Sequence, residues 1–184
     1  MRDLSLHILD LMQNSIRAQA KVVSLSVALG SDGILSIIIE DDGTGMSEDL
    51  LARVTSPFAT TRTTRKVGLG IPMMAENCRL AGGDLSIESR LGVGTRLTAT
   101  LDTASIDCLP LGDLPGTVTT LVTMNPDHPE FTLHCSSPQG EMQFDTREIR
   151  EALQGVSLSE PEIAAWILES LREEIEPIFG GVIL

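Results

Sequence analysis

Two glycine-containing segments carry the residues of this chain whose types and spacing could do chemistry. The first, Asp41-Asp42-Gly43-Thr44-Gly45-Met46, follows the apolar, strand-like run Leu35–Ile39, and the second, Gly68-Leu69-Gly70, opens a helix-like segment. A carboxylate at the end of an apolar strand is partly buried and needs hydrogen-bond donors, which an amine on a ring would supply. Glycines permit tight turns and let a ligand come close to the backbone. Together the two segments predict a nucleotide pocket in which Asp41 binds the base.

Three polar side chains near the N-terminus fit the same site. On a helix, Asp10, Asn14 and Arg17 fall within about 60° of one another. The amide oxygen of Asn14 suits Mg²⁺, Arg17 could meet a phosphate, and Asp10 could take a proton from an attacking water or hydroxyl. The alternative is that these residues form only the solvated face of an amphipathic helix.

The glycine pair Gly68-Leu69-Gly70 predicts an anion site, because free N–H groups at the start of a helix attract phosphate. It matches neither the dinucleotide fingerprint nor the phosphate loop of other nucleotide-binding folds. The preceding residues 60–66 crowd hydroxyls and positive charge together, with Thr60, Thr61, Arg62 and Lys66 among them. We interpret this stretch as a lid that closes over a triphosphate, although a solvated loop has a similar composition.

Charge is spread unevenly along the 184 residues, whose net charge is −13. Residues 1–102 hold 10 basic and 12 acidic residues, whereas residues 103–184 hold 3 and 14, a net of −11. This argues against non-specific binding to nucleic acid or to anionic membranes, both of which need a basic surface. It allows a basic protein partner.

The three cysteines are odd in number and lack C-x-x-C spacing, so the sequence indicates neither a disulfide framework nor a zinc site. We find no signal peptide and no apolar run near the roughly 20 residues that span a bilayer. We therefore expect a soluble, cytoplasmic protein with free thiols.

Hydrophobic periodicity predicts an α+β fold for residues 1–102. Asp3 is the expected N-cap of the first helix, and the expected strands are mostly hairpin neighbours. The predicted helices cover residues 4–19, 47–53 and 71–80, and the predicted strands cover residues 23–29, 34–40, 85–89 and 96–101. Helices gathered on one face of such a sheet give a two-layer α/β sandwich rather than a doubly wound sheet.

Residues 103–116 contain two prolines and two glycines, and we expect a linker there. Beyond it we expect a small, acidic α+β C-terminal domain, residues 117–184. Its predicted strands cover residues 117–123, 131–135 and 142–144, and its predicted helices cover residues 146–153 and 160–175. Trp166 lies on the last, amphipathic helix, where we expect it in the core or at a domain interface; a partner-binding face is the alternative.

In this order, these segments resemble the ATP-binding domain shared by histidine kinases, DNA gyrase and MutL mismatch-repair proteins. The resemblance covers about residues 4–102, over half of the chain. Residues 8–17 look like the first box, Asp41-x-Gly43-x-Gly45 like the second, and Gly68–Ile71 like the third. Residues 56–61 are similar to the phenylalanine-containing stretch ahead of the lid, and residues 92–97 to the closing strand.

The resemblance implies Mg²⁺ coordination by Asn14, a phosphate contact for Arg17, and adenine binding by Asp41 with help from Thr95. It implies ATP and Mg²⁺ as cofactors and Asp10 as the catalytic residue. The expected ATP-binding residues are Asn14, Arg17, Asp41, Gly43, Gly45, Met46, Phe58, Thr60, Thr61, Arg62, Lys66, Gly68, Leu69, Gly70, Ile71 and Thr95.

Two departures from the family pattern bear on the reaction. Asp10 stands where hydrolytic members have Glu, and its side chain is one methylene shorter, which puts hydrolysis in doubt. The sequence begins close to the first helix, so we expect no phosphoacceptor hairpin ahead of it, and we assign His7 no phosphoacceptor role.

Three hypotheses follow for the use of bound ATP. The first is a free-standing protein kinase or phosphotransfer regulator, with Asp10 as base and the lid holding the γ-phosphate. The second is an ATP-gated module that binds a protein partner with little or no turnover. The third, ranked last, is a slow ATPase. The sequence leaves the partner and the oligomeric state open.

Overall fold

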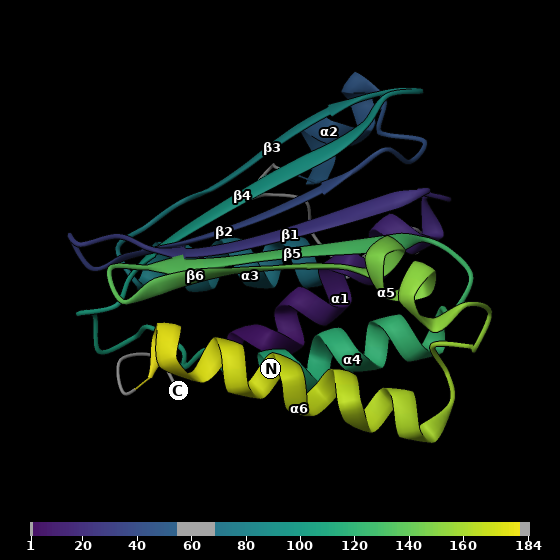
Figure 1. Cartoon of the computed structure of the whole chain (residues 1–184). Coiled ribbons are helices and arrows are strands. Elements are labelled where there is room, and N and C mark those ends of the chain that lie inside the picture. The colour runs from purple at the N-terminus through teal and green to yellow at the C-terminus, as the bar shows by residue number, and fades with distance from the viewer. Residues whose placement is uncertain (1, 55–68, 181–184) are drawn as a thin grey trace.

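A single six-stranded sheet organises the computed structural model, which describes residues 2–54 and 69–180. Its strand order is β3-β4-β2-β1-β5-β6 (Figure 1). Only the β1–β5 pair is parallel within this sheet; the other neighbours are antiparallel. The strands are β1 (Val22–Leu29), β2 (Ile34–Asp41), β3 (Leu85–Arg90), β4 (Gly94–Asp102), β5 (Glu130–Ser137) and β6 (Gly140–Asp145).

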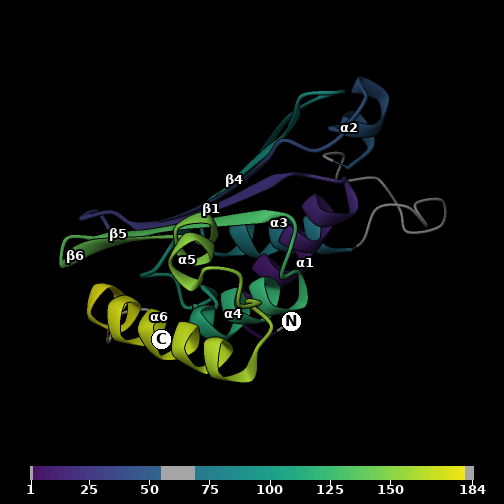
Figure 2. The same ribbon diagram turned by 45° about the vertical axis from the view of Figure 1, so that its right-hand side comes forward.

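Helices α1, α3, α4 and α6 lie along one face of the sheet, and the opposite face is left uncovered by the described helices (Figures 1 and 2). The predicted two-layer α/β sandwich is therefore confirmed. The helices are α1 (Leu4–Arg17), α2 (Glu48–Val54), α3 (Gly70–Leu80), α4 (Leu114–Met124), α5 (Thr146–Leu153) and α6 (Pro161–Phe179). Among the described residues, we find no helix with the length and apolarity needed to cross a membrane.

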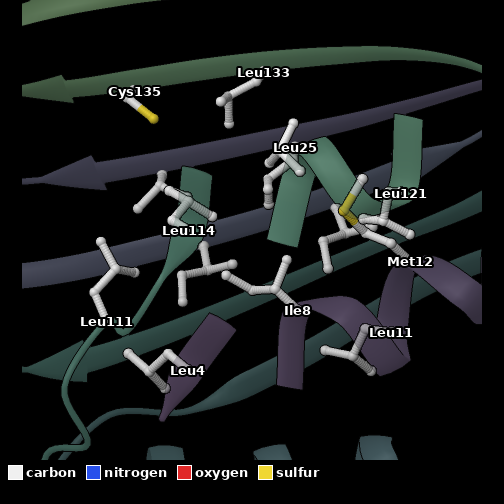
Figure 3. Packing of buried hydrophobic residues seen from close by; sticks show 14 of the residues in the cluster. Leu4, Ile8, Leu11, Met12, Leu25, Leu111, Leu114, Leu121, Leu133 and Cys135 are labelled. Carbon is white, nitrogen blue, oxygen red and sulfur yellow. The ribbon is translucent and has the colours of Figure 1, made fainter. Parts of the chain in front are cut away.

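The core lies between the sheet and this helical layer. Alternate residues of the central strands point into it, as the period of two in their sequences predicts. Figure 3 shows Leu4 and Ile8 of α1 in one cluster with Leu25 of β1, Leu121 of α4 and Leu133 of β5. The buried side of α1 therefore fixes the helix on the sheet, and with it the polar residues of the helix.

The start of α1 is held by its predicted cap and by the expected linker. Asp3 accepts a hydrogen bond from the Leu6 N–H at 3.0 Å. The Ser5 hydroxyl donates to the Leu111 carbonyl at 2.6 Å, and the Leu111 side chain is fully buried. The segment expected to be a linker is thus partly packed into the core, and α4 begins inside it.

The prediction of a strand at residues 117–123 is wrong, because these residues lie in α4. Their Thr and Val residues favour strands by intrinsic propensity. Two local features decide for a helix: the Asp113 side chain caps the Gly116 N–H at 3.0 Å, and Pro115 occupies the first turn. Burial of Val118, Leu121 and Val122 on one face adds tertiary packing.

The C-terminal residues have the α+β character that we expected, but they do not form a sheet of their own. β5 runs parallel to β1 over its length and β6 closes the edge, so both continue the sheet of residues 4–102. On α6 the expected apolar stripe is buried at Ile167, Leu171 and Ile175. Trp166 is 52% exposed, so the expectation of a core position for it is corrected.

Replacement of Leu111 by Ala should lower the free energy of unfolding by about 2–5 kcal/mol, because it leaves a cavity against α1. Urea denaturation measures this change. Ile106→Ala is the matched control: this side chain of the same segment is 98% exposed, and we expect a change within about 0.5 kcal/mol. Equal stability of the two variants would show that residues 103–113 act as a loose connection.

Candidate nucleotide-binding site

A cavity of about 260 Å³ lies beside α1, at the end of β2 and near the start of α3. Its apolar lining includes Leu11, Ile39, Ile71 and Leu97, which suits a flat ring. Seven residues that we predicted for the ATP site line this one cavity, namely Asn14, Arg17, Asp41, Gly45, Met46, Ile71 and Thr95. The structure thus brings together residues from four separate parts of the sequence.

Asp41 is the polar anchor of the cavity. Its Oδ2 accepts a hydrogen bond from the Ser15 hydroxyl at 2.6 Å, and its Oδ1 accepts one from the Gly43 N–H at 2.9 Å. Each carboxylate oxygen has a second lone pair that can accept from a bound amine. The carboxylate is therefore oriented before any ligand arrives.

Ser15 is a residue that the sequence reasoning missed. It is buried on α1, one position after Asn14, and directs its hydroxyl to Asp41. The available signal was its place four residues after Leu11, on the buried side of the helix. A hydroxyl there needs a polar partner, and a strand-end carboxylate can supply one.

The loop of residues 42–46 lies directly on the end of α1. The Thr44 N–H donates to the Ala18 carbonyl at 2.8 Å. A Cβ atom on Gly43 would lie 2.7 Å from the same carbonyl oxygen, so the predicted close approach at Gly43 is to the protein's own backbone. The second glycine, Gly45, has a φ of 64°, in the left-handed region that glycine tolerates.

Ser89, also missed, supports this loop from β3. Its hydroxyl oxygen accepts from the Met46 N–H at 2.8 Å and lies 2.8 Å from the Thr95 hydroxyl and 3.0 Å from the Gly94 carbonyl oxygen. Thr95 lies directly opposite Asp41 in the β2–β4 register. The small hydroxyl network therefore joins the loop to the strand that carries Thr95.

Asp42 fastens the loop to the start of β1. Its Oδ1 accepts from the Lys21 N–H at 2.7 Å and from the Val22 N–H at 2.9 Å. These backbone hydrogen bonds, with Val22 the largest cause, lower the pKa of Asp42. The Lys21 carbonyl in turn accepts from the Glu130 N–H of β5 at 2.8 Å.

Asn14 and Arg17 contact each other at the rim of the cavity. An Nη of Arg17 donates to Asn14 Oδ1 at 3.1 Å, whereas Asn14 Nδ2 is buried without a hydrogen-bond partner among the described residues. The amide oxygen is a hard ligand of the kind that Mg²⁺ takes, alongside water and phosphate oxygens. A cation bound there would compete with Arg17 for this oxygen and free the guanidinium for phosphate.

Asp10 lies against the first residue of α3. A Cβ atom on Gly70 would be 2.1 Å from Asp10 Oδ2, so a larger residue would displace the Asp10 carboxylate from this position. The start of a helix carries partial positive charge, which favours a carboxylate at this place. Asp10 is partly exposed and lies outside the residues that line the cavity.

Several predicted site residues cannot be placed. Phe58, Thr60, Thr61, Arg62, Lys66 and Gly68 lie outside the described residues. Leu69 precedes α3 and its side chain is 59% exposed. Across residues 2–54 and 69–180, no cluster of three or more His, Cys, Asp and Glu side chains could hold a metal ion.

A family model, described as histidine kinase-, DNA gyrase B- and HSP90-like ATPase, matches residues 2–105. The match contains α1, the Asp41 loop, α3 and the strand of Thr95, which are the elements that build the cavity. The chain belongs to this ATPase family. Residues 2–105 are therefore an ATP-binding, histidine kinase-like domain, as the resemblance of the sequence motifs implied.

Curated relatives include bacterial kinases. Histidine protein kinase DivJ of Caulobacter vibrioides is 33% identical over 51% of this chain and 17% of its own length. Sporulation kinase D of Bacillus subtilis is 30% identical over 51% and 19%. Sensor kinase CckA of Brucella abortus is 26% identical over 79% and 16%. The chain thus spans less than a fifth of each of these relatives.

Among solved structures, the N-terminal domain of a DNA repair protein aligns with 79% of this chain and 52% of its own, with a TM-score of 0.51. The sequence identity is 15%, so this similarity concerns the fold alone. The structural alignment covers a larger share of this chain than the family model does.

Gly94→Ala should damage the site more than Gly92→Ala in the same turn. Both glycines have positive φ, and that strain costs about 1 kcal/mol. A Cβ on Gly94 would also lie 1.9 Å from the Asp41 carbonyl oxygen, whereas Gly92 has nothing within 4 Å. We expect the free energy of unfolding to fall by at least about 2 kcal/mol more for Gly94→Ala, measured by urea denaturation. Equal losses of unfolding free energy in the two variants would contradict a close contact between Gly94 and the Asp41 carbonyl.

Asp42→Asn should destabilise the protein in a pH-dependent way. Because folding lowers the pKa of Asp42, its carboxylate stabilises the fold above the ordinary Asp pKa of about 4. This contribution is lost as the pH falls through the lowered value. The stability difference between wild type and variant should thus be largest at neutral pH and shrink in acid, as thermal unfolding across pH would show. A difference independent of pH would refute the role of the charge.

Proposed function

We propose that this chain binds Mg-ATP in the described cavity, with Asp41 accepting a hydrogen bond from the adenine amine. The observation that carries the proposal is the Asp41 carboxylate, held by Ser15 and Gly43 at the polar end of an apolar-walled cavity. A carboxylate accepts from an amino group and is left unpaired by a base that presents a carbonyl there, so it favours adenine over guanine.

The phosphate end of the nucleotide would lie toward Asn14 and Arg17. Asn14 would hold Mg²⁺ through its amide oxygen, and Arg17 would pair with a phosphate oxygen. A magnesium ion held there would neutralise phosphate charge. The predicted contacts of Arg62 and Lys66 with the γ-phosphate belong to the same proposal.

We infer that the bound nucleotide serves phosphoryl transfer to a protein acceptor. The relatives that match this domain are named as kinases, which supports this choice over plain hydrolysis. The bond between the γ-phosphorus and the β–γ bridging oxygen breaks, a bond from the γ-phosphorus to the acceptor atom forms, and ADP leaves. Asp10 takes the proton of the acceptor group if that group is a hydroxyl.

The position of Asp10 favours a second candidate, an ATP-gated module with little turnover. Its short carboxylate lies against Gly70, at the start of the helix that follows the predicted lid. A nucleotide that changes this contact would change the surface offered to a partner, without the carboxylate having to act as a base. Measuring binding and phosphate transfer separately distinguishes the two candidates.

Asp41→Asn should weaken Mg-ATP binding by at least about tenfold, because the amide replaces one acceptor oxygen with a donor that faces the adenine amine. Calorimetric titration of Mg-ATP and Mg-GTP into both proteins measures the effect. The wild type should prefer ATP, and the variant should lose that preference. Similar ATP affinity in both proteins would remove Asp41 from the binding site.

The reaction is tested with γ-labelled ATP and purified cellular protein fractions. Wild type should transfer label to a protein acceptor, whereas Asp10→Asn should bind Mg-ATP and transfer little. Released phosphate, measured in parallel, reports hydrolysis. Tight binding with neither transfer nor release would reject the kinase and favour the ATP-gated module.

A further inference from the structure

A buried histidine joins the helix that carries Asp10 to the helix that begins at Gly70. His7 of α1 is fully buried, and its Nε2 lies 2.8 Å from the Asn77 Nδ2 of α3. The question is why a polar ring lies in this place, where an aliphatic side chain would pack without a desolvation cost.

The hydrogen bond fixes the state of the ring. Asn77 Nδ2 is a donor, so His7 Nε2 accepts and the single ring proton lies on Nδ1. That Nδ1 is buried and has no hydrogen-bond partner among the described residues. A buried N–H without an acceptor costs roughly 1–3 kcal/mol, a cost that the hydrogen bond to Asn77 has to offset.

Burial, more than the neighbouring charges, favours the neutral ring. Burial is the largest cause that lowers the pKa of His7, whereas Asp3, the N-cap of α1, and Asp10 raise it. The charged residues of α3 are Glu76 and Arg79, which pair with each other at the surface at 2.6 Å. Helix α4, which also packs on α1, contains no charged residue.

The contact lies close to the proposed site. His7 precedes Asp10 by one turn of α1, and Asn77 follows Gly70 by about two turns of α3. The two helices therefore meet at two places, a hydrogen bond between His7 and Asn77 and the close approach of Asp10 to Gly70. The buried face of α3, with Ile71, Met74 and Cys78, also packs in the core. The hydrogen bond between His7 and Asn77 adds a directional contact to this packing.

We propose that His7 and Asn77 are positioning residues that fix the start of α3 against Asp10 and thereby set the affinity of the site for Mg-ATP. The effect on affinity rests on the function proposed above. The effect on the position of α3 does not rest on that function, since it is present in the protein without nucleotide. Neither residue touches the cavity, so both act through the helices that carry Asp10 and Gly70.

The test compares His7→Phe and Asn77→Leu, which remove the hydrogen bond, with His7→Gln, which keeps an acceptor near the position of Nε2. Arg79→Gln is the matched control, because it breaks an exposed ion pair on α3. Hydrogen exchange of the Met73 and Met74 amides, near the start of α3, is measured without nucleotide, and Mg-ATP affinity is measured by calorimetry. We expect faster exchange and about tenfold weaker binding in the first two variants, and wild-type values for His7→Gln and Arg79→Gln.

The proposal is overturned if His7→Phe and Asn77→Leu melt at lower temperature but keep wild-type hydrogen exchange at the start of α3 and wild-type Mg-ATP affinity. The pair would then stabilise the fold without positioning α3. If His7→Phe does not fold, Asn77→Leu decides, since Asn77 is only partly buried. If the wild type itself fails to bind Mg-ATP, the proposed function falls. The exchange of the Met73 and Met74 amides then still decides whether the pair positions α3.

Discussion

The burial of one side of α1 is the constraint on which the rest of this structure depends. Its apolar residues pack on the sheet and on α4, and its first turn is tied to the Leu111 carbonyl. Because side chains on a helix keep fixed angles to one another, this packing also fixes where Asp10, Asn14 and Ser15 point. Core stability and site geometry are therefore set by the same helix, and a loss of packing at Leu4 or Ile8 would also disturb the site.

The site itself is built from close backbone approaches more than from long side chains. Gly43 lies on the end of α1, Gly70 on Asp10, and Gly94 on the Asp41 carbonyl. At each contact a Cβ atom would come too close to its neighbour. The protein's own packing therefore favours glycine at these positions, in addition to any need for room for a ligand.

The sequence predicted the two-layer sandwich and most of its elements because period-two and helical patterns are strong in residues 4–102. It also predicted half of the residues that line the cavity, since Asp41, Asn14 and Thr95 lie in recognisable motifs. It failed at residues 117–123, where capping and burial outweigh the strand propensity of Thr and Val. Ser89 could not be found, because a hydroxyl becomes informative only when its partner from another strand or helix is known. Ser15 gave one signal, its place on the buried side of the first helix, but its partner Asp41 became known only from the structure.

The peptide group between Lys21 and Val22 links the Asp42 loop to β5. The Lys21 carbonyl and the Val22 N–H belong to one planar peptide group, which resonance keeps rigid. The N–H of this peptide group donates to the Asp42 carboxylate, and its carbonyl oxygen accepts from the Glu130 N–H of β5. The two hydrogen bonds polarise each other through the same amide. A tilt of this peptide group at Glu130 therefore moves the N–H that donates to Asp42, so β5 and the loop of residues 42–46 are rigidly coupled.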